Sequence, residues 1–229
     1  MKESKIIIPK WNEVNTSGIT AVENGNALIK VNSNENPRII YEPKYYNKGI
    51  PDAVKDCYMR EIVYQMLLKA LVLLPTRYGI KIYDAWRPFE VQRFLYDEWV
   101  KKLITEEEID AETAEERAKQ FVSAPNKDPQ KPFVHATGGA IDLTIIDSDK
   151  NELDMGTPFD DFSSLAHTDS FENSDNEEVK NNRRLLYSVM TNAGFTNYPS
   201  EWWHYDYGDA FWASEKGLKT SHFGGIYKK

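Results

Sequence analysis

Cysteine is almost absent from this chain, which has only Cys57 among its 229 residues. A single cysteine excludes an intramolecular disulfide and any metal site built from several thiolates. Cys57 lies in "AVKDCYMREIVYQMLLKALVLL", whose helical spacing of apolar residues predicts a buried helix residue rather than a nucleophile. Histidine is also scarce, with four residues, so the position of each one is informative.

Long hydrophobic runs are lacking too. None reaches the roughly 20 apolar residues that a membrane-spanning helix needs, so no membrane partner is expected. The start, "MKESKIIIPKW", does not have the apolar segment of a signal peptide. We therefore expect a soluble, cytoplasmic protein; a periplasmic or secreted protein whose export signal had been removed would show the same pattern.

Positive charge is in deficit. The chain has 28 Lys and Arg against 36 Asp and Glu, a net charge of −8, and it has no run of basic residues. Nucleic-acid binding needs clustered Lys and Arg to neutralise phosphates, so no nucleic-acid partner is expected. The hydrophobic content of 41% is sufficient for one domain with its own core. The sequence sets no expectation for the oligomeric state.

The order of predicted elements favours an α+β fold. The chain contains no G-x-G-x-x-G pattern and no repeat, and its helices and strands alternate irregularly, unlike a doubly wound α/β fold. We expect one domain over 1–229, with an N-terminal extension over 1–35 and an acidic loop region over 147–182. Hydrophobic periodicity predicts helices over 53–74, 88–104, 105–122 and 181–195, and strands over 79–87, 140–146 and 201–212.

Particular residues define some ends of these elements. Thr105 and Glu108 have the spacing of a capping box, which predicts a new helix beginning there. Gly194 is expected to end the helix over 181–195. The strand "AIDLTII" shows an almost continuous apolar run, so we expect it to be buried on both faces.

One histidine, His135, stands in "PFVHATGGAIDLTI", seven positions before Asp142. Glycine permits positive φ and close backbone approach, so Gly138 and Gly139 can turn the chain and let both side chains converge. A buried carboxylate without a partner is costly, so Asp142 in an apolar strand should have one. Two explanations fit this stretch: a metal site, or a buried structural hydrogen bond.

A second histidine follows a glutamate in "EWWH", where Glu201 comes three residues before His204. On a continuous strand these positions face opposite sides, so the two side chains converge only if the strand ends or twists between them. Two histidines and one carboxylate leave a fourth position for water, which is typical of a catalytic zinc site. A glutamate that lies nearby without binding the metal can transfer protons. His167 and His222 have no such context and are expected to be surface or packing residues.

These motifs resemble, in the same order along the chain, those of the zinc D-alanyl-D-alanine dipeptidases. "HATGGAID" is similar to that family's His-x-x-Gly-x-Ala-x-Asp motif, and "YDAWRP", "MGTPFDDF" and "GFTNYPSEWWHYDYGD" extend the resemblance over about residues 41–212. "MGTPFD" indicates the dipeptidase branch rather than the related carboxypeptidases. The resemblance implies a single α+β domain with a central, mainly antiparallel sheet flanked by helices, shared with the hedgehog signalling domain.

The resemblance also implies the chemistry of the site. It implies one zinc ion per chain, with His135, Asp142 and His204 as ligands. It implies Glu201 as general base and acid, and Arg87 as the group that steadies the oxyanion; without the resemblance, a surface salt bridge is the simplest interpretation of Arg87. The implied reaction is hydrolysis of D-Ala-D-Ala, or a related D,D-dipeptide, to free amino acids.

Phe133 departs from the family's pattern, which has a serine two residues before the first histidine. Phenylalanine cannot form that hydrogen bond and it adds apolar bulk, so we expect it to border the substrate pocket and to alter recognition. Tyr41 and Asp84 are further candidate pocket residues. Two alternatives stay open: a peptidoglycan D,D-carboxypeptidase or L,D-endopeptidase of the same superfamily, and a zinc-bearing binding domain, which would need neither Glu201 nor Arg87.

Overall fold

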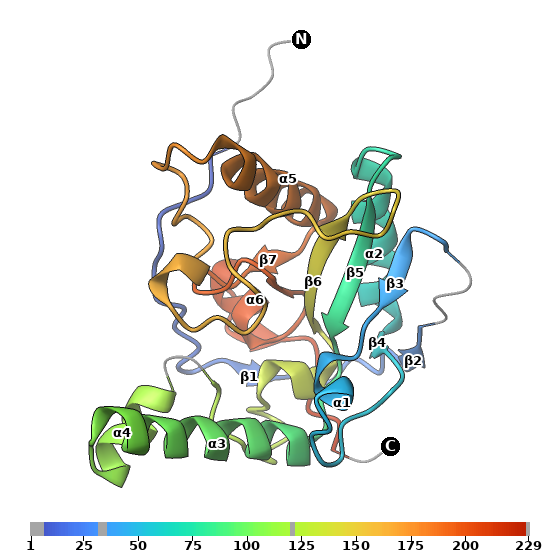
Figure 1. The fold of residues 1–229 in the computed structure, drawn as a ribbon. Helices are drawn as coiled ribbons and strands as arrows, with labels where there is room; N and C mark the ends of the chain where they lie inside the picture. Colours follow the sequence, from blue (N-terminus) through green and yellow to red (C-terminus); the bar gives the residue numbers. More distant parts are fainter. Residues whose placement is uncertain (1–6, 32–35, 120–121, 228–229) are drawn as a thin grey trace.

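The computed structural model describes residues 7–31, 36–119 and 122–227. Its centre is a five-stranded sheet (Figure 1). In spatial order the strands are β3 (Ile39–Tyr41), β5 (Gly79–Asp84), β6 (Ala140–Ile146), β8 (His204–Asp206) and β7 (Thr196–Asn197). β3 runs parallel to β5, and each other neighbouring pair in this sheet is antiparallel. The expected α+β fold with a mainly antiparallel sheet is therefore confirmed.

The middle strand, β6, has the burial that its sequence predicts. All seven of its residues are buried, as an apolar run without polar alternation requires. Helices α2 (Glu61–Leu73) and α5 (Glu177–Ala193) pack against each other and share the main hydrophobic core with the sheet (Figure 1). Gly194 ends α5 with a φ of 113°, as expected.

Strand pairing replaces the first part of the helix predicted over 53–74. Tyr58–Arg60 forms β4, which pairs antiparallel with β2 (Leu28–Lys30), and α2 begins only at Glu61. Cys57 is 3% exposed, as expected, but it precedes β4 instead of lying in a helix. The helical spacing was present in the sequence, but backbone hydrogen bonds to a distant strand decided the conformation.

A helical hairpin lies beside the sheet (Figure 1). It consists of α3 (Phe89–Glu107) and α4 (Ala111–Ala118). The capping box predicted at Thr105 is wrong, because α3 continues through it and the Thr105 hydroxyl donates to the carbonyl of Lys101. The break falls at Glu108, with a φ of 53°, and Asp110 caps α4 by accepting a backbone N–H in its first turn. The N-cap of this helix is therefore an aspartate, and not the threonine that the sequence pattern favoured.

The remaining elements surround the sheet. They are α1 (Lys44–Asn47), the 3-10 helices η1 (Val134–Thr137) and η2 (Ser164–Ala166), α6 (Ala210–Glu215), β1 (Thr20–Ala21) and β9 (Thr220–Ser221). Residues 7–31 of the predicted N-terminal extension contribute β2 and β1, and β1 pairs in parallel with β9. The strand predicted over 201–212 is divided between β8 and α6, because the Asp209 side chain accepts from the Trp212 N–H and starts the helix.

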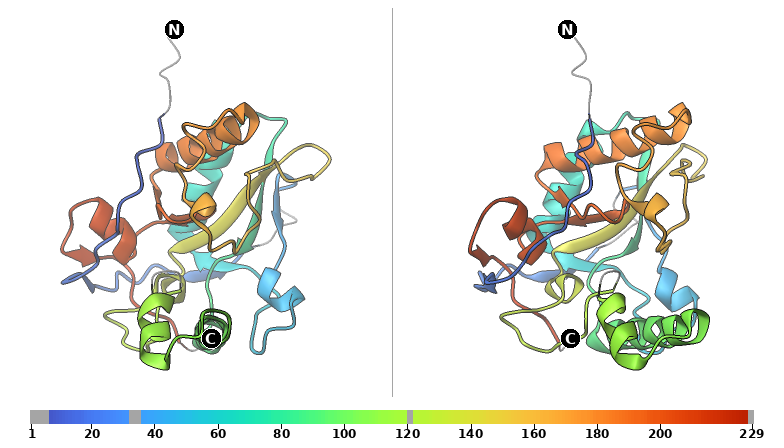
Figure 2. Two further views of the ribbon diagram at one scale, coloured as in Figure 1. Left: turned by 60° about the vertical axis from the view of Figure 1, so that its left-hand side comes forward. Right: turned by 90° about the vertical axis from the view of Figure 1, so that its left-hand side faces the viewer.

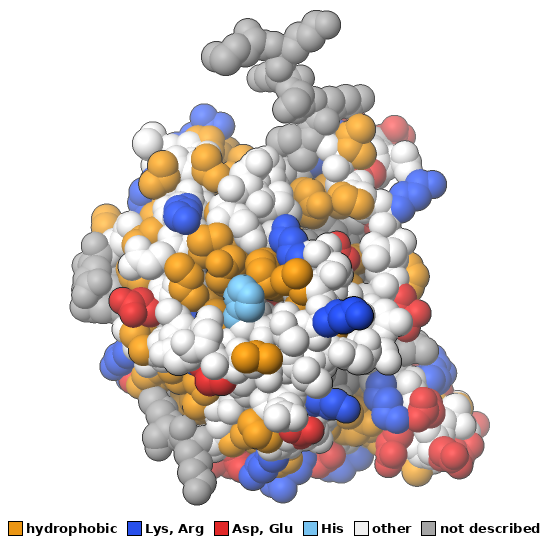
Figure 3. All heavy atoms as spheres, turned by 180° about the vertical axis from the view of Figure 1, so that it is seen from behind, with side chains coloured by type: hydrophobic (Ala, Val, Ile, Leu, Met, Phe, Trp, Pro, Cys, Tyr) orange, Lys and Arg blue, Asp and Glu red, His pale blue; other side chains and the backbone are white. Residues whose placement is uncertain are grey.

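Among the described residues, no helix is both long enough and apolar enough to span a bilayer. On the rear face, basic side chains are scattered among acidic and apolar ones (Figure 3).

Candidate metal centre and active-site cleft

The three predicted ligands meet between η1 and the sheet. His135 lies in η1, Asp142 lies in β6, and His204 begins β8 directly opposite Asp142. One ligand atom from each residue lies within 4.8 Å of the others, and all three residues are buried. Gly138 ends η1 with a φ of 73°, and a Cβ at this position would meet Leu28 Cδ1 at 2.7 Å. Glycine therefore permits the turn that brings His135 beside β6.

Hydrogen bonds determine which ring nitrogen of each histidine faces the third ligand. Nδ1 of His135 lies 2.7 Å from the carbonyl of Ala85, and Nε2 of His204 lies 2.8 Å from Oδ1 of Asp206. Both partners are acceptors, so these nitrogens donate. The other nitrogens, Nε2 of His135 and Nδ1 of His204, lie 3.4 and 2.9 Å from Asp142 oxygens. Metal-binding histidines commonly have this orientation, so the donor set fits a zinc ion.

The two imidazoles have opposite electrostatic surroundings. Burial and the Arg87 guanidinium lower the pKa of His135 well below its usual value. Burial also acts against a charged His204, but the carboxylates of Asp206 and Asp142 raise its pKa well above the usual value. Burial acts to raise the pKa of Asp142, but the neighbouring His135, His204 and Arg87 outweigh it and lower the pKa. Two carboxylates thus flank one ligand histidine, an arrangement that favours a bound cation.

Glu201 lies in the turn before β8, where strand alternation does not apply. Its backbone N–H donates to the carbonyl of Tyr198 at 3.0 Å, and its Oε2 lies 3.7 Å from Nδ1 of His204. The side chain is 16% exposed, and burial raises the pKa of its carboxyl to about 8. A carboxyl with such a pKa can accept and return a proton near neutral pH. Glu201 and His204 converge because the strand begins only at the histidine.

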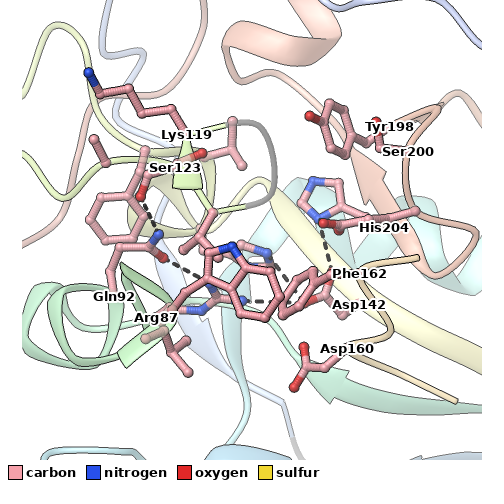
Figure 4. A pocket seen from close by; sticks show the side chains of 18 of the residues that line it. Arg87, Gln92, Lys119, Ser123, Asp142, Asp160, Phe162, Tyr198, Ser200 and His204 are labelled. Carbon is pink, nitrogen blue, oxygen red and sulfur yellow. Dashed lines mark hydrogen bonds and ion pairs between the residues drawn. The ribbon is translucent and has the colours of Figure 1, made fainter. Parts of the chain in front are cut away.

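Arg87 is buried, so the interpretation as a surface salt bridge is wrong. Its side chain is 9% exposed, and Nε donates to Asp84 Oδ2 at 2.7 Å. Nη1 donates to Gln92 Oε1 at 2.8 Å (Figure 4). Nη2 lies 3.4 Å from both the Tyr45 hydroxyl and Oδ2 of Asp142. The two short hydrogen bonds orient the guanidinium so that Nη2 faces the metal ligands.

The metal-ligand set opens into a cleft of about 1130 Å³. Arg87, Asp160 and His204 line it (Figure 4), and Glu201 lines it as well. Residues of the segment 11–16 and of α6 line the cleft, and so do residues of the α3–α4 hairpin. This volume is slightly above the range of about 300–1,000 Å³ that is typical of small-ligand sites, so the cleft has room for a small molecule.

The structure separates the three predicted pocket residues. Phe133 borders the cleft, as expected; because it caps the 3-10 helix η1, this position does not result from strand alternation. Tyr41 and Asp84 instead line a much smaller cavity, of about 10 Å³, on another side of Arg87. Asp84 therefore supports the guanidinium and does not face the cleft. Burial raises the pKa of Asp84 to about 7, although Arg87 acts to lower it.

Two acidic residues of the site were missed by the sequence reasoning. Asp160 lines the cleft, and its carboxylate accepts from the Tyr45 hydroxyl at 3.1 Å and from Lys48 Nζ at 2.9 Å; burial raises its pKa. It lies in a loop, where no periodicity indicates direction. Asp206 had a usable signal, because a strand residue two positions after His204 shares its face.

The other two histidines lie outside the ligand set, as expected. His167 stacks on Trp11, with ring centroids 5.4 Å apart. His222 packs against Trp212, with centroids 5.0 Å apart.

Several known proteins that are similar to this chain have the same name, D-alanyl-D-alanine dipeptidase. A D-alanyl-D-alanine dipeptidase from Synechocystis sp. is 30% identical over 151 residues, 58% of this chain and 61% of the relative. Another, from Enterococcus faecium, is 34% identical over 148 residues, 62% of this chain and 68% of the relative. The chain thus spans about three fifths of the length of the first relative. Among solved structures, VanYB in complex with D-alanine-D-alanine is similar at a TM-score of 0.44 and 16% identity, over 74% of this chain and 88% of that one.

A family model also matches most of the chain. The family is described as D-ala-D-ala dipeptidase, and the match covers residues 48–222. This range includes the three predicted metal ligands, Arg87 and Glu201. The chain therefore belongs to the D-ala-D-ala dipeptidase family.

Proposed function

We propose that this protein hydrolyses D-Ala-D-Ala, or a closely related D,D-dipeptide, to free amino acids. The observation that carries the proposal is the convergence of His135, Asp142 and His204 beside Glu201 in an open cleft. Membership of the family, and relatives named as dipeptidases, support the substrate class.

His135, Asp142 and His204 would hold one zinc ion per chain. Zinc bound there supplies Lewis-acid chemistry, since it lowers the pKa of water and polarises a carbonyl. Structural zinc sites use four protein ligands. Within the described residues, the cluster consists of three, which supports a catalytic role.

Glu201 would move the proton. It is reachable from the cleft, and its raised pKa allows it to take a proton from the attacking water and pass it to the leaving amine. Its position beside His204 places this transfer next to the metal ligands.

Arg87 and Asp160 would bind opposite charges on the substrate. Nη2 of Arg87 faces the ligand cluster, where negative charge develops on the carbonyl oxygen, and Asp84 and Gln92 hold the guanidinium in that orientation. Asp160 presents a carboxylate in the same cleft and could accept the amino group of a dipeptide.

The other two interpretations are less well supported. A zinc-bearing binding domain needs neither a glutamate with a raised pKa nor a buried arginine aimed at the ligands. The relatives compared above are named as dipeptidases, which favours a free dipeptide over peptidoglycan. The cytoplasmic location stays a proposal, and cell fractionation checks it.

The test is a stereochemical substrate screen. Zinc-loaded protein should release free alanine from D-Ala-D-Ala but not from L-Ala-L-Ala. Glu201→Ala should keep the fold and the zinc but lose at least about 10²-fold in kcat, the lower end for general acid–base catalysis. Near-normal turnover by this variant would remove Glu201 from the mechanism, and no release from any D,D-dipeptide would overturn the proposed function.

A further inference from the structure

An N-terminal segment outside the part matched by the family reaches the proposed active site. Residues 7–16 pass α5 and α6 on the outside of the molecule (Figure 2), and Trp11 lines one rim of the cleft. Its backbone N–H donates to Oδ2 of Asp169 at 3.0 Å, and its indole Nε1–H donates to Oγ of Ser200 at 2.9 Å. Its ring stacks on His167 with 15° between the ring planes. One side chain therefore connects two segments that lie far from it in the sequence.

One of these segments, residues 166–169, is bonded to the other, which is the turn that carries the proposed general base. The backbone N–H groups of Thr168 and Trp202 donate to the carbonyls of Pro199 and Ala166, at 3.0 and 3.1 Å. These bonds tie residues 166–168 to both sides of the turn. The tryptophan adds a side-chain connection between the same two segments, and it ends on the serine next to the general base.

The position of the turn matters because it is irregular. The predicted metal ligands lie on or beside strands and are buried, whereas Glu201 lies outside β8, lines the cleft and has a side chain that is 16% exposed. Misplacing a reacting group by about 1 Å can cost on the order of 10²-fold in rate. A contact that reduces the freedom of this turn therefore acts on turnover.

We propose that Trp11 is a positioning residue, which holds Ser200 and thereby keeps the carboxyl of Glu201 beside His204. This inference rests on the proposed hydrolytic function. It assigns a role in the active site to a residue that precedes the family match by more than 30 positions. The hydrogen bond to Ser200 carries the effect, and the stack on His167 together with the bond to Asp169 keeps the indole in place.

A double-mutant cycle tests the hydrogen bond. Trp11→Phe keeps an aromatic ring for the stack but removes the donor, and Ser200→Ala removes the acceptor. Each should lower kcat on D-Ala-D-Ala roughly three- to tenfold, as expected for the loss of one hydrogen bond, with a smaller change in KM. The double variant should be no slower than the slower single variant, because both remove the same bond. Losses that multiply would show that the two residues act independently, which would overturn the proposal.

A matched control separates this bond from general attachment of the segment. The Ser214 hydroxyl donates to the carbonyl of Asn15 at 2.8 Å, so Ser214→Ala removes a similar bond at another point of the same segment. This variant should keep kcat within about twofold. An equal loss of kcat in Ser214→Ala would mean that any loosening of the segment matters, which would contradict a specific role for Trp11.

Hydrogen–deuterium exchange gives a measurement that does not depend on activity. In Trp11→Ala, amides of residues 198–203 should exchange faster than in the wild type, while those of β6 should keep their rates. Unchanged exchange rates in residues 198–203, or an equal increase of the rates in β6, would refute the role of Trp11 as a positioning residue. If the wild type hydrolyses no D,D-dipeptide, the proposed function fails, and the exchange experiment still decides whether Trp11 supports the turn.

Discussion

The two sides of the cleft are built differently. On the sheet side, His135, Asp142 and His204 are buried, and hydrogen bonds orient both imidazoles. On the hairpin side, α3 and α4 have a separate small core, made of Tyr96, Leu103, Ala114, Ala118 and Val122. The comparison teaches that the predicted metal ligands are buried beside the central sheet, whereas the opposite wall of the cleft belongs to a unit with its own small core.

The two sides are connected at defined points. Gln92 of α3 accepts from Arg87 and donates to the carbonyl of Ser123, so it links the hairpin to the arginine proposed to bind the oxyanion (Figure 4). Trp99 of α3 packs against Phe162, with ring centroids 4.5 Å apart. Substitutions on each side should therefore have effects that differ in kind, and the following experiments compare them.

The largest effect is expected from removing a metal ligand on the sheet side. His204→Ala should abolish stoichiometric zinc binding and turnover, because a site with two remaining ligands holds zinc poorly. His222→Ala is the control, since His222 packs against Trp212 outside the ligand set. Metal analysis of the purified proteins is the measurement. Equal zinc content in wild type and His204→Ala would refute the ligand assignment.

The next effect concerns the arginine that connects the two sides. Arg87→Lys should lower kcat on the order of 10²-fold, because lysine cannot reproduce the bonds to Asp84 and Gln92 while facing the ligand cluster. Zinc content should be unchanged. Steady-state kinetics separate the possibilities: a change confined to KM would make Arg87 a ground-state anchor for the substrate.

A smaller effect is expected at Phe133, which borders the cleft next to a ligand. Phe133→Ser removes apolar bulk and adds a hydroxyl, so it should shift selectivity toward D-Ala-D-Ala and away from bulkier D,D-dipeptides. The measurement is the ratio of kcat/KM between the two substrates. A ratio that stays within about twofold, roughly 0.4 kcal/mol, would show that Phe133 does not set specificity.

The smallest effect on turnover is expected in the hairpin core. Leu103→Ala should lower the free energy of unfolding by about 2–5 kcal/mol, the range for such a truncation, but leave zinc content and kcat unchanged. Leu143→Ala is its counterpart, since Leu143 is fully buried in β6 beside Asp142. It should lower both stability and zinc affinity. Denaturant unfolding and zinc titration would show whether the two sides of the cleft are independent. An equal loss of zinc affinity in Leu103→Ala and Leu143→Ala would show that they are not.

The sequence by itself determined the features that depend on neighbouring residues. An apolar run specified β6 as a buried strand, and Gly194 specified the end of α5, because burial and positive φ are local requirements. The same holds for the choice of ligands. Two histidines and an aspartate in short motifs indicated a metal site. Glu201 was expected to converge with His204 only if the strand ended or twisted between them, and β8 does begin at His204.

Tertiary structure alone decided what depends on distant partners. Residues 58–60 have helical spacing but form β4, since β2 offers them backbone hydrogen bonds. Arg87 also has distant partners, because its Nη2 lies 3.4 Å from the Tyr45 hydroxyl and from Oδ2 of Asp142, neither of which is part of its own motif. Trp11 is a further case, because its indole bonds to a residue 189 positions away. Contacts of this kind leave no periodic signal in a sequence, since they depend on where the folded chain brings two segments together.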